Sequence, residues 1–280
     1  MAIENADQKA FWERFSEHWV NHQSDLDGLM NPVLNGVLQR ANLQTGQTVL
    51  DVGCGTGTST LRAAGAVGAG GKVMGADISE PMLKRARDVS VDVSNVEFVT
   101  ADVADHPFDA AQFDRVISRF GVMFFVDPLT AFKNIRRSMA PGARLSMACW
   151  STLDANPWFR VPMYAAKDRL GAPPAVDPDD PGPLAFRNID RVLGILEGAG
   201  FSDIQAEAED LFLTPPGDLD HVVRHASMIG PAARAVEYFE ATEEDFEAIV
   251  ESVKTAFSDF MQADGARVPA RINFFTASLA

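Results

Sequence analysis

The stretch of sequence that decides the fold runs from Val49 to Thr60 and reads VLDVGCGTGTST. Its short apolar run ends at Val52 and predicts a buried strand. Gly53, Gly55 and Gly57 follow at alternate positions and predict a tight turn into a helix. Because glycine has no side chain, a ligand can lie against the peptide groups of the turn and the N-terminus of that helix. The stretch therefore predicts a strand, a turn and a helix that bind a ligand of mononucleotide size.

Strands and helices alternate outward from this stretch. Strand-like runs occupy residues 72–76, 96–100, 113–118 and 144–150, and helical patterns occupy residues 80–89 and 128–139. The second helix begins at Asp127-Pro128, and we expect Pro141-Gly142 to stop it. Later runs at residues 201–208 and 272–278 raise the number of strands to seven. Parallel strands need long crossover connections, so the pattern predicts a Rossmann-like α/β fold, with a mostly parallel sheet and helices on both faces.

The flanking segments are predicted to be helical. The apolar stripe Phe11, Phe15, Trp19 predicts an N-terminal helix, and a second helical pattern covers residues 25–41. The proline and glycine content of residues 171–183 predicts a loop. A helix is expected at residues 191–199, and the pattern of residues 217–264 predicts helix throughout. We therefore expect three parts: residues 1–45 as a helical cover, 46–150 as the ligand-binding core, and 151–280 as the rest of the sheet with a helical cap, at about 151–186 and 215–265, inserted before the last strand.

Charge and cysteine content limit the partners. The chain has 280 residues, with 24 basic and 39 acidic side chains, and its net charge of −15 disfavours nucleic acid and anionic membranes. Its two cysteines, Cys54 and Cys149, have no neighbour at metal-ligand spacing, so we expect neither a disulfide nor a metal site. The start of the chain does not resemble a signal peptide, and no apolar run is long enough to span a membrane. We expect a soluble, cytoplasmic monomer or homodimer that acts on a small molecule.

The spacing of the glycines distinguishes between two classes of ligand. In the dinucleotide fingerprint G-x-G-x-x-G, counted from Gly53, the third glycine would fall at Thr58. Asp51 also places a carboxylate beside the first glycine, where a pyrophosphate would be repelled and an ammonium group would be attracted. Cationic S-adenosylmethionine therefore fits this turn better than NAD.

Two further aspartates end predicted strands. Asp77 can accept hydrogen bonds from both ribose hydroxyls, with Ile78 and Met82 as apolar surface for adenine; the alternative is that Asp77 caps the following helix. Asp102 can accept from the adenine amino group, and the alternative is a turn-forming aspartate. The chain leaves the fourth strand at Ser118, in the crevice where open α/β folds bind their ligands.

These motifs, in this order and spacing, resemble the class I S-adenosylmethionine-dependent methyltransferases, in particular the group similar to ubiquinone and menaquinone biosynthesis enzymes. The resemblance covers VLDVGCGTG, ADISEPML, ADVADHPF and FDRVISRFGVMFF. It implies S-adenosylmethionine as cofactor and S-adenosylhomocysteine as product. It also implies these contacts: Asp51 and Gly53 with the methionine end, Cys54, Gly55 and Gly57 in the turn, Asp77 with ribose, Asp102 and Val103 with adenine, and Ser118 with the methionyl side. Where relatives usually have PGG, this chain has PGARL, which leaves the cofactor contacts unaffected.

Aromatic residues gather where an acceptor should bind. Substrate contacts are expected from a flat, apolar set together with one cation: Trp12, Trp19, Arg119, Phe120, Trp150 and Trp158. A core role is the alternative for these rings, and we favour it for Trp19 and Phe124. Arg119 would pair with an acidic substrate group or the cofactor carboxylate, or else with Asp127.

Methyl transfer is an in-line displacement on a sulfonium carbon, and its chemistry requires no metal. A base is needed only for a weakly acidic acceptor, and the candidates are His18, His22, His221 and His225. We select His22 because the N-terminal helix commonly covers the cofactor in this family. The acceptor atom, oxygen, nitrogen, sulfur or carbon, stays open. The alternatives are a non-catalytic S-adenosylmethionine-binding protein and, less well supported by the glycine spacing, an NAD-linked oxidoreductase.

Overall fold

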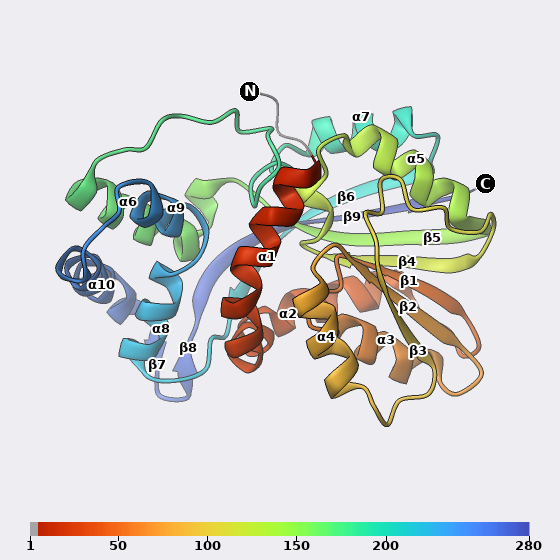
Figure 1. Cartoon of the computed structure of the whole chain (residues 1–280), viewed down its shortest axis with the longest axis horizontal. Helices are drawn as coiled ribbons and strands as arrows, with labels where there is room; N and C mark the ends of the chain where they lie inside the picture. Colours follow the sequence, from red (N-terminus) through yellow and green to blue (C-terminus); the bar gives the residue numbers. More distant parts are fainter. Residues whose placement is uncertain (1–4, 280) are drawn as a thin grey trace.

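The computed structural model describes the backbone of residues 5–279, with side chains described from residue 10 onward except at positions 11, 15 and 18. A seven-stranded sheet has the order β3-β2-β1-β4-β5-β9-β6 (Figure 1). Its strands are β1 (Thr48–Val52), β2 (Lys72–Asp77), β3 (Val96–Thr100), β4 (Phe113–Arg119), β5 (Met139–Trp150), β6 (Ser202–Leu213) and β9 (Val268–Ser278). The first five strands are parallel, and β9 runs antiparallel to both β5 and β6. The predicted seven-stranded, mostly parallel α/β fold is confirmed.

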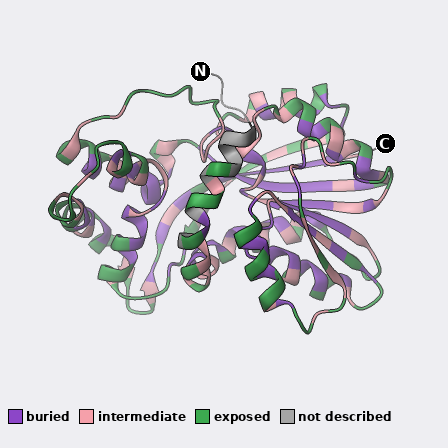
Figure 2. Cartoon of the chain, viewed as in Figure 1, coloured by how far each residue is buried: buried purple, intermediate pink, exposed green. Residues whose placement is uncertain are grey.

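Helices cover both faces of this sheet. On one face lie α2 (Gln23–Ala41), α3 (Thr58–Val67) and α4 (Glu80–Val89); on the other lie α5 (Pro128–Ser138) and α7 (Ile189–Gly198) (Figure 1). The central strands are buried from both sides, as parallel strands between two helical layers should be (Figure 2). This arrangement leaves the carboxyl ends of β1 to β4 at one edge of the sheet.

The first 45 residues have two different roles. α1 (Asn5–Asn21) contacts α4, and the described part of its surface is largely exposed (Figure 2). In contrast, α2 packs against β4 and β5 with a fully buried face: Leu26, Leu29, Met30, Val33, Leu34, Val37 and Ala41. Only α1 is therefore available for the predicted cover, because α2 belongs to the core. The stripe residues Phe11 and Phe15 lie outside the described side chains.

The cap is a separate group of helices at one end of the sheet (Figure 1). It consists of α6 (Pro157–Leu170), α8 (Leu219–Ser227), α9 (Gly230–Tyr238) and α10 (Glu243–Phe257), which pack on one another. The last three are inserted between β6 and β9, as predicted. The prediction that residues 217–264 are wholly helical is wrong. A new helix, α9, begins near Pro231, because proline cannot continue the preceding helix. In addition, β7 (Met261–Gln262) forms a hairpin with β8 (Gly265–Ala266). Loop residues 171–188 connect α6 to α7.

The boundary between α5 and β5 differs from the sequence prediction. The sequence predicts helix through Met139, yet Met139 has extended backbone angles and pairs with Phe113 of β4. Pro141 disfavours helical angles in the residue before it, so the chain becomes extended earlier than the predicted stop. β5 therefore begins five residues before the predicted start at Arg144.

Candidate active site

A cavity of about 1040 Å³ lies at the carboxyl ends of β1 to β4. The sheet side of its wall consists of the residues that follow these strands: 52–56, 77–78, 101–104 and 119–121. Its other side comes from α1, α2, the loop at 171–187 and the start of α9. Ligand pockets commonly measure about 300 to 1,000 Å³, so this cavity has room for two small molecules side by side.

The glycine turn has a different requirement at each position. Gly53 has φ +68°, and a Cβ atom there would lie 2.6 Å from the Gly121 Cα. Gly55 has φ +54°, and a Cβ atom there would make one ordinary contact, with the Met82 sulfur at 3.6 Å. Both glycines line the cavity together with Cys54. Gly57 does not line it, because it packs against Ala86 of α4, so the predicted ligand contact at Gly57 is not observed.

Asp77 holds the glycine turn from the end of β2. Its carboxylate accepts hydrogen bonds from the Gly55 amide at 2.8 Å and from the Ser79 amide at 2.9 Å. Burial raises the pKa of Asp77, and these backbone donors partly oppose the rise. The N-cap of α4 is Ser79, so Asp77 braces the turn before the helix without capping it. Asp77 also lines the cavity, next to Ile78 and Met82.

Asp102 follows β3, which lies two strands away from β1 and its glycine turn in the sheet. One of its carboxylate oxygens accepts from the Ala104 amide at 2.9 Å, which is the turn-forming role that the sequence left as an alternative. Asp102, Val103 and Ala104 all line the cavity. The turn contact therefore positions Asp102 on the wall, where its other oxygen can face a ligand.

Asp51 and Ser118 lie behind the wall, since neither lines the cavity. Asp51 is fully buried, and one carboxylate oxygen accepts from Ser59 at 2.6 Å and Thr60 at 2.7 Å. Its other oxygen has no hydrogen-bond partner, and burial raises the pKa of Asp51 to about 6. The Ser118 hydroxyl donates to the Val52 carbonyl and accepts from the Gly121 amide, so the expected contact of Ser118 with the methionyl group is replaced by a contact within the protein.

Arg119 forms an ion pair that the sequence did not predict. Its Nη2 atom lies 3.1 Å from the Asp27 carboxylate of α2, whereas Asp127 caps α5 through the Thr130 amide. The predicted Asp127 alternative is therefore wrong. The other terminal nitrogen of Arg119 is buried without a hydrogen-bond partner, although the side chain lines the cavity. Thr58 also donates to Asp27, which connects α2 to the glycine turn.

Sequence reasoning missed the two polar residues of α2 that line the cavity, Gln23 and Asp27. The Gln23 side-chain amide donates to the Thr56 carbonyl at 3.3 Å. Gln23 and Asp27 therefore both connect α2 to the glycine turn. An acidic residue between the buried Leu26 and Met30 is the one signal for Asp27 in the sequence. Its function becomes apparent only in the folded structure, where Arg119 lies beside Asp27 and forms an ion pair with it.

Aromatic rings form the apolar part of the wall. Phe120 stacks on Trp150 with ring centroids 4.6 Å apart, and Trp12 meets Phe124 edge to face at 4.8 Å. These four residues and Trp19 all line the cavity, and Trp19 and Phe124 also pack against the core, the role that the sequence favours for them. Trp158 is the exception, since it is completely buried among the cap helices against Phe257. The predicted substrate contact of Trp158 is therefore wrong.

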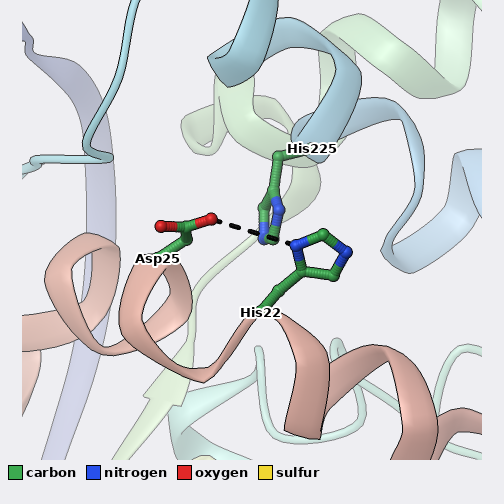
Figure 3. A group of neighbouring side chains, drawn as sticks. All are labelled: His22, Asp25 and His225. Carbon is green, nitrogen blue, oxygen red and sulfur yellow. Dashed lines mark ion pairs between the residues drawn. The ribbon is translucent and has the colours of Figure 1, made fainter.

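None of the described histidine side chains lines the cavity. His22 lies instead beside Asp25 and His225, in a group of side chains that could hold a metal ion (Figure 3). The sequence predicted no metal site because these residues are far apart along the chain. The assignment of His22 as a base therefore lacks a contact with the cavity, and the His18 side chain lies outside the described residues.

Comparison with known proteins agrees with this geometry. A family model described as a methyltransferase domain matches residues 49–142. A demethylmenaquinone methyltransferase of Staphylococcus aureus (strain MRSA252) is 33% identical over 169 residues, which cover 57% of this chain and 69% of that protein. The chain belongs to the class I S-adenosylmethionine-dependent methyltransferases. Its closeness to the ubiquinone and menaquinone type confirms the resemblance seen in the sequence.

Other relatives extend the comparison. A demethylmenaquinone methyltransferase of Staphylococcus carnosus (strain TM300) is 33% identical over 145 residues, or 49% of this chain and 60% of that protein. The match thus spans about three fifths of that relative's length. A solved putative methyltransferase from an antibiotic biosynthesis pathway of Anabaena variabilis has a TM-score of 0.59 at 17% identity, covering 87% of this chain and 96% of that one. Among the described helices of this family member, none is long and apolar enough to cross a membrane.

Proposed function

We propose that this chain transfers the methyl group of S-adenosylmethionine to a small, flat, apolar acceptor. One observation carries the proposal: one cavity is lined in part by the glycine turn and two strand-end aspartates, and in part by aromatic rings. The first part suits a nucleoside with an amino-acid tail, and the second suits an apolar ring system. Methyl transfer needs donor and acceptor side by side.

The donor is expected to lie along the strand ends. Asp77 would accept from the ribose hydroxyls and Asp102 from the adenine amino group, with Ile78, Met82 and Val103 against the adenine ring. The methionyl carboxylate would accept a hydrogen bond from the terminal nitrogen of Arg119 that has no hydrogen-bond partner in the protein. Asp51 places a negative charge close behind Gly53, which favours the ammonium group and the sulfonium at this end of the cavity.

The acceptor would lie against the stacked pair of Phe120 and Trp150, with Trp12 and Trp19 of α1 above it. The names of the relatives, which methylate demethylmenaquinone, support a flat ring system as acceptor class. We propose the same chemical class here, a ring compound that carries a nucleophilic atom next to an aromatic or quinoid system.

The chemistry then consists mainly of positioning. An electron pair of the acceptor would form a bond to the methyl carbon, the bond from that carbon to sulfur would break, and its electrons would stay on sulfur to give S-adenosylhomocysteine. Alignment of the two molecules can supply several kcal/mol, since a bound near-attack geometry removes about 7 to 11 kcal/mol of entropic and solvent barrier at best. The apolar wall excludes water, a competing nucleophile. An acidic acceptor would already have lost its proton to solvent before it binds, so the transfer does not require a histidine on the described cavity wall.

The test is binding followed by turnover. Calorimetry should show S-adenosylhomocysteine binding to the full chain with no detectable binding of NADH, and tritiated S-adenosylmethionine should label a member of a panel of hydroquinones, phenols and thiols. Binding of NADH alone would support an oxidoreductase in place of this proposal. Cofactor binding without labelling of any flat acceptor would contradict the acceptor class and favour a non-catalytic binding protein.

We further propose that the protein works in the cytoplasm as a monomer or homodimer and does not bind nucleic acid. The net charge of −15 supports this proposal, because it repels polyanions. Both cysteines are buried and free, which suits a reducing compartment. Light scattering of the purified chain and a gel-shift assay with mixed-sequence DNA would test these expectations.

A further inference from the structure

A second group of polar side chains lies outside the cavity, where α2 meets the cap. His22 occupies the junction of α1 and α2, Asp25 lies in the first turn of α2, and His225 belongs to α8 (Figure 3). One ring nitrogen of each histidine and one carboxylate oxygen of Asp25 all lie within 4.8 Å of one another. Three side chains from two segments about 200 residues apart therefore point at one small volume.

Local structure fixes this geometry. Asp218 caps α8 by accepting from the His221 amide at 3.0 Å, so the helix starts at a defined residue. His221 and His225 then lie one turn apart on the same face, and the His221 Nε2 atom is 3.0 Å from an Asp25 carboxylate oxygen. His225 is only 5% exposed. The Asp25 carboxylate is thus surrounded by three imidazole rings.

We propose that His22, Asp25 and His225 bind a divalent transition-metal ion, with zinc as the best fit. Imidazole nitrogen and carboxylate oxygen are common zinc ligands, whereas magnesium and calcium select sites made of oxygen atoms. Ligand atoms in a tetrahedral zinc site lie about 3.3 Å apart, given bonds of about 2.0 Å. Side-chain rotations that shorten the separations, all within 4.8 Å, to that value would complete the site, and His221 would then orient Asp25 from outside.

Such an ion would connect the cap to the wall of the cavity. Gln23 and Asp27, which flank Asp25 in α2, line the cavity, and so do Ile229 and Gly230, which follow α8. The ligands themselves do not line it. The ion would therefore hold α8 against the start of α2 and set the position of the cap, without contact with the donor or the acceptor.

The experiment uses the full chain without a histidine tag, titrated with zinc by competition calorimetry and with cobalt(II) by visible absorption. Cobalt should give the intense visible bands of a tetrahedral site. His22→Gln, on the α2 side, and His225→Gln, on the cap side, should each weaken zinc binding at least about tenfold. His106→Gln is the matched control, because its ring packs on Phe108 and does not belong to this group, and it should keep full affinity.

Asp25→Asn provides a second test in case His225→Gln does not fold, because His225 is buried. The Asp25 side chain is partly exposed, and asparagine has nearly the same shape as aspartate. Asp25→Asn should retain the circular dichroism of the parent and still lose zinc affinity about tenfold. Full zinc affinity in His22→Gln or in Asp25→Asn, or equal losses in His106→Gln, would overturn the site. S-adenosylhomocysteine titrations of the same variants report separately on the cavity, so failure of the metal site and failure of the proposed function are distinguishable.

Discussion

At the scale of single residues, the three strand-end aspartates have three different environments. Asp51 is buried with one oxygen unpartnered, Asp77 has both oxygens on backbone amides, and Asp102 has one oxygen in a turn. The sequence pattern alone treats them as equivalent strand-end acids. Their different surroundings give each a distinct measurable consequence.

Asp77 should contribute to binding through the ribose hydroxyls. Asp77→Ala is expected to weaken S-adenosylhomocysteine binding by about 1.5 to 3 kcal/mol, the range for hydrogen bonds to a charged group. The same change removes the brace on the Gly55 amide, so calorimetry should include a 2′,3′-dideoxy analogue. The parent should prefer the natural ligand and the variant should not. An equal preference in both proteins would mean that Asp77 only braces the turn.

Asp51 should make stability depend on pH. Burial raises the pKa of Asp51 in the folded state from 3.8 to about 6. Well below pH 3.8, Asp51 is protonated in both the folded and the unfolded chain, so it does not affect the pH dependence of stability there. As the pH rises from 3.8 to 6, only the unfolded chain ionises, and the folded state loses stability until the loss is complete above 6. Between pH 5 and 7.5 this loss amounts to about 1 to 1.5 kcal/mol.

Urea unfolding of Asp51→Asn measures this effect, because the variant cannot titrate. Its free energy of unfolding relative to the parent should rise by that amount from pH 5 to pH 7.5. Asp92→Asn, at an exposed position, is the control for the change of charge. A difference between parent and Asp51→Asn that stays constant over this range would show that Asp51 is ionised throughout.

Arg119 should recognise the carboxylate of the donor. Arg119→Met is expected to weaken S-adenosylhomocysteine binding about tenfold or more, since a charge-assisted hydrogen bond contributes about 1.5 to 3 kcal/mol. Methylthioadenosine lacks the amino-acid tail, and its affinity should be unchanged. Arg62→Met, whose parent side chain pairs with Asn31 and Asn35 on the surface, is the control. Parallel losses for both ligands would assign Arg119 to the fold through Asp27.

At the scale of elements, the glycine turn illustrates how one motif serves two purposes. Gly53 allows the backbone of Gly121 to approach, and Gly57 allows α4 to approach. Gly55 alone combines a positive φ with a place on the cavity wall where an added Cβ would make only an ordinary contact. The turn therefore both packs β1 against its neighbours and exposes peptide groups to a ligand.

Gly55→Val should abolish cofactor binding, because its side chain would enter the cavity. Gly46→Val is the matched control: Gly46 has φ +86° with nothing within 4 Å of an added Cβ, so it introduces similar backbone strain far from the cavity. Both variants should lose some thermal stability, and only Gly55→Val should lose binding in calorimetry. Unchanged affinity in a folded Gly55→Val protein would place the donor elsewhere.

At the scale of the whole molecule, α1 and the cap both contribute to the wall of the cavity. Trp12 and Trp19 of α1 line it, and so do residues 229–231 and 233–235 of the cap. α10 has its own buried face, with Ile249, Val253 and Phe257 packed in the cap. The cap is therefore a packed unit, and any opening should involve α1 and the edge of the cap at α9.

We expect this cover to be mobile without ligand. Backbone amides of residues 5–21 and 228–238 should exchange quickly in the free protein and slow several-fold when S-adenosylhomocysteine binds, since segments that admit ligands have low local stability. Hydrogen exchange with mass spectrometry measures both regions at once, and α10 is the internal reference. Equal protection with and without ligand would make these segments fixed walls of the cavity.

The sequence by itself determined the order of strands and helices, the nucleotide-sized turn and the ligand class. Local signals suffice for these features, because hydrophobic period, glycine spacing and strand-end acids depend on near neighbours in the chain. The position of β3, for example, follows from residues 96–100 alone.

Only the tertiary structure decided which side chains share a space. It paired Arg119 with Asp27 in place of Asp127, moved Trp158 into the cap, and turned the Ser118 hydroxyl toward the backbone. It also brought His22 to His225 across about 200 residues. These contacts depend on how helices pack on the sheet, and packing is set by the shapes of surfaces distant in sequence, which no local pattern records.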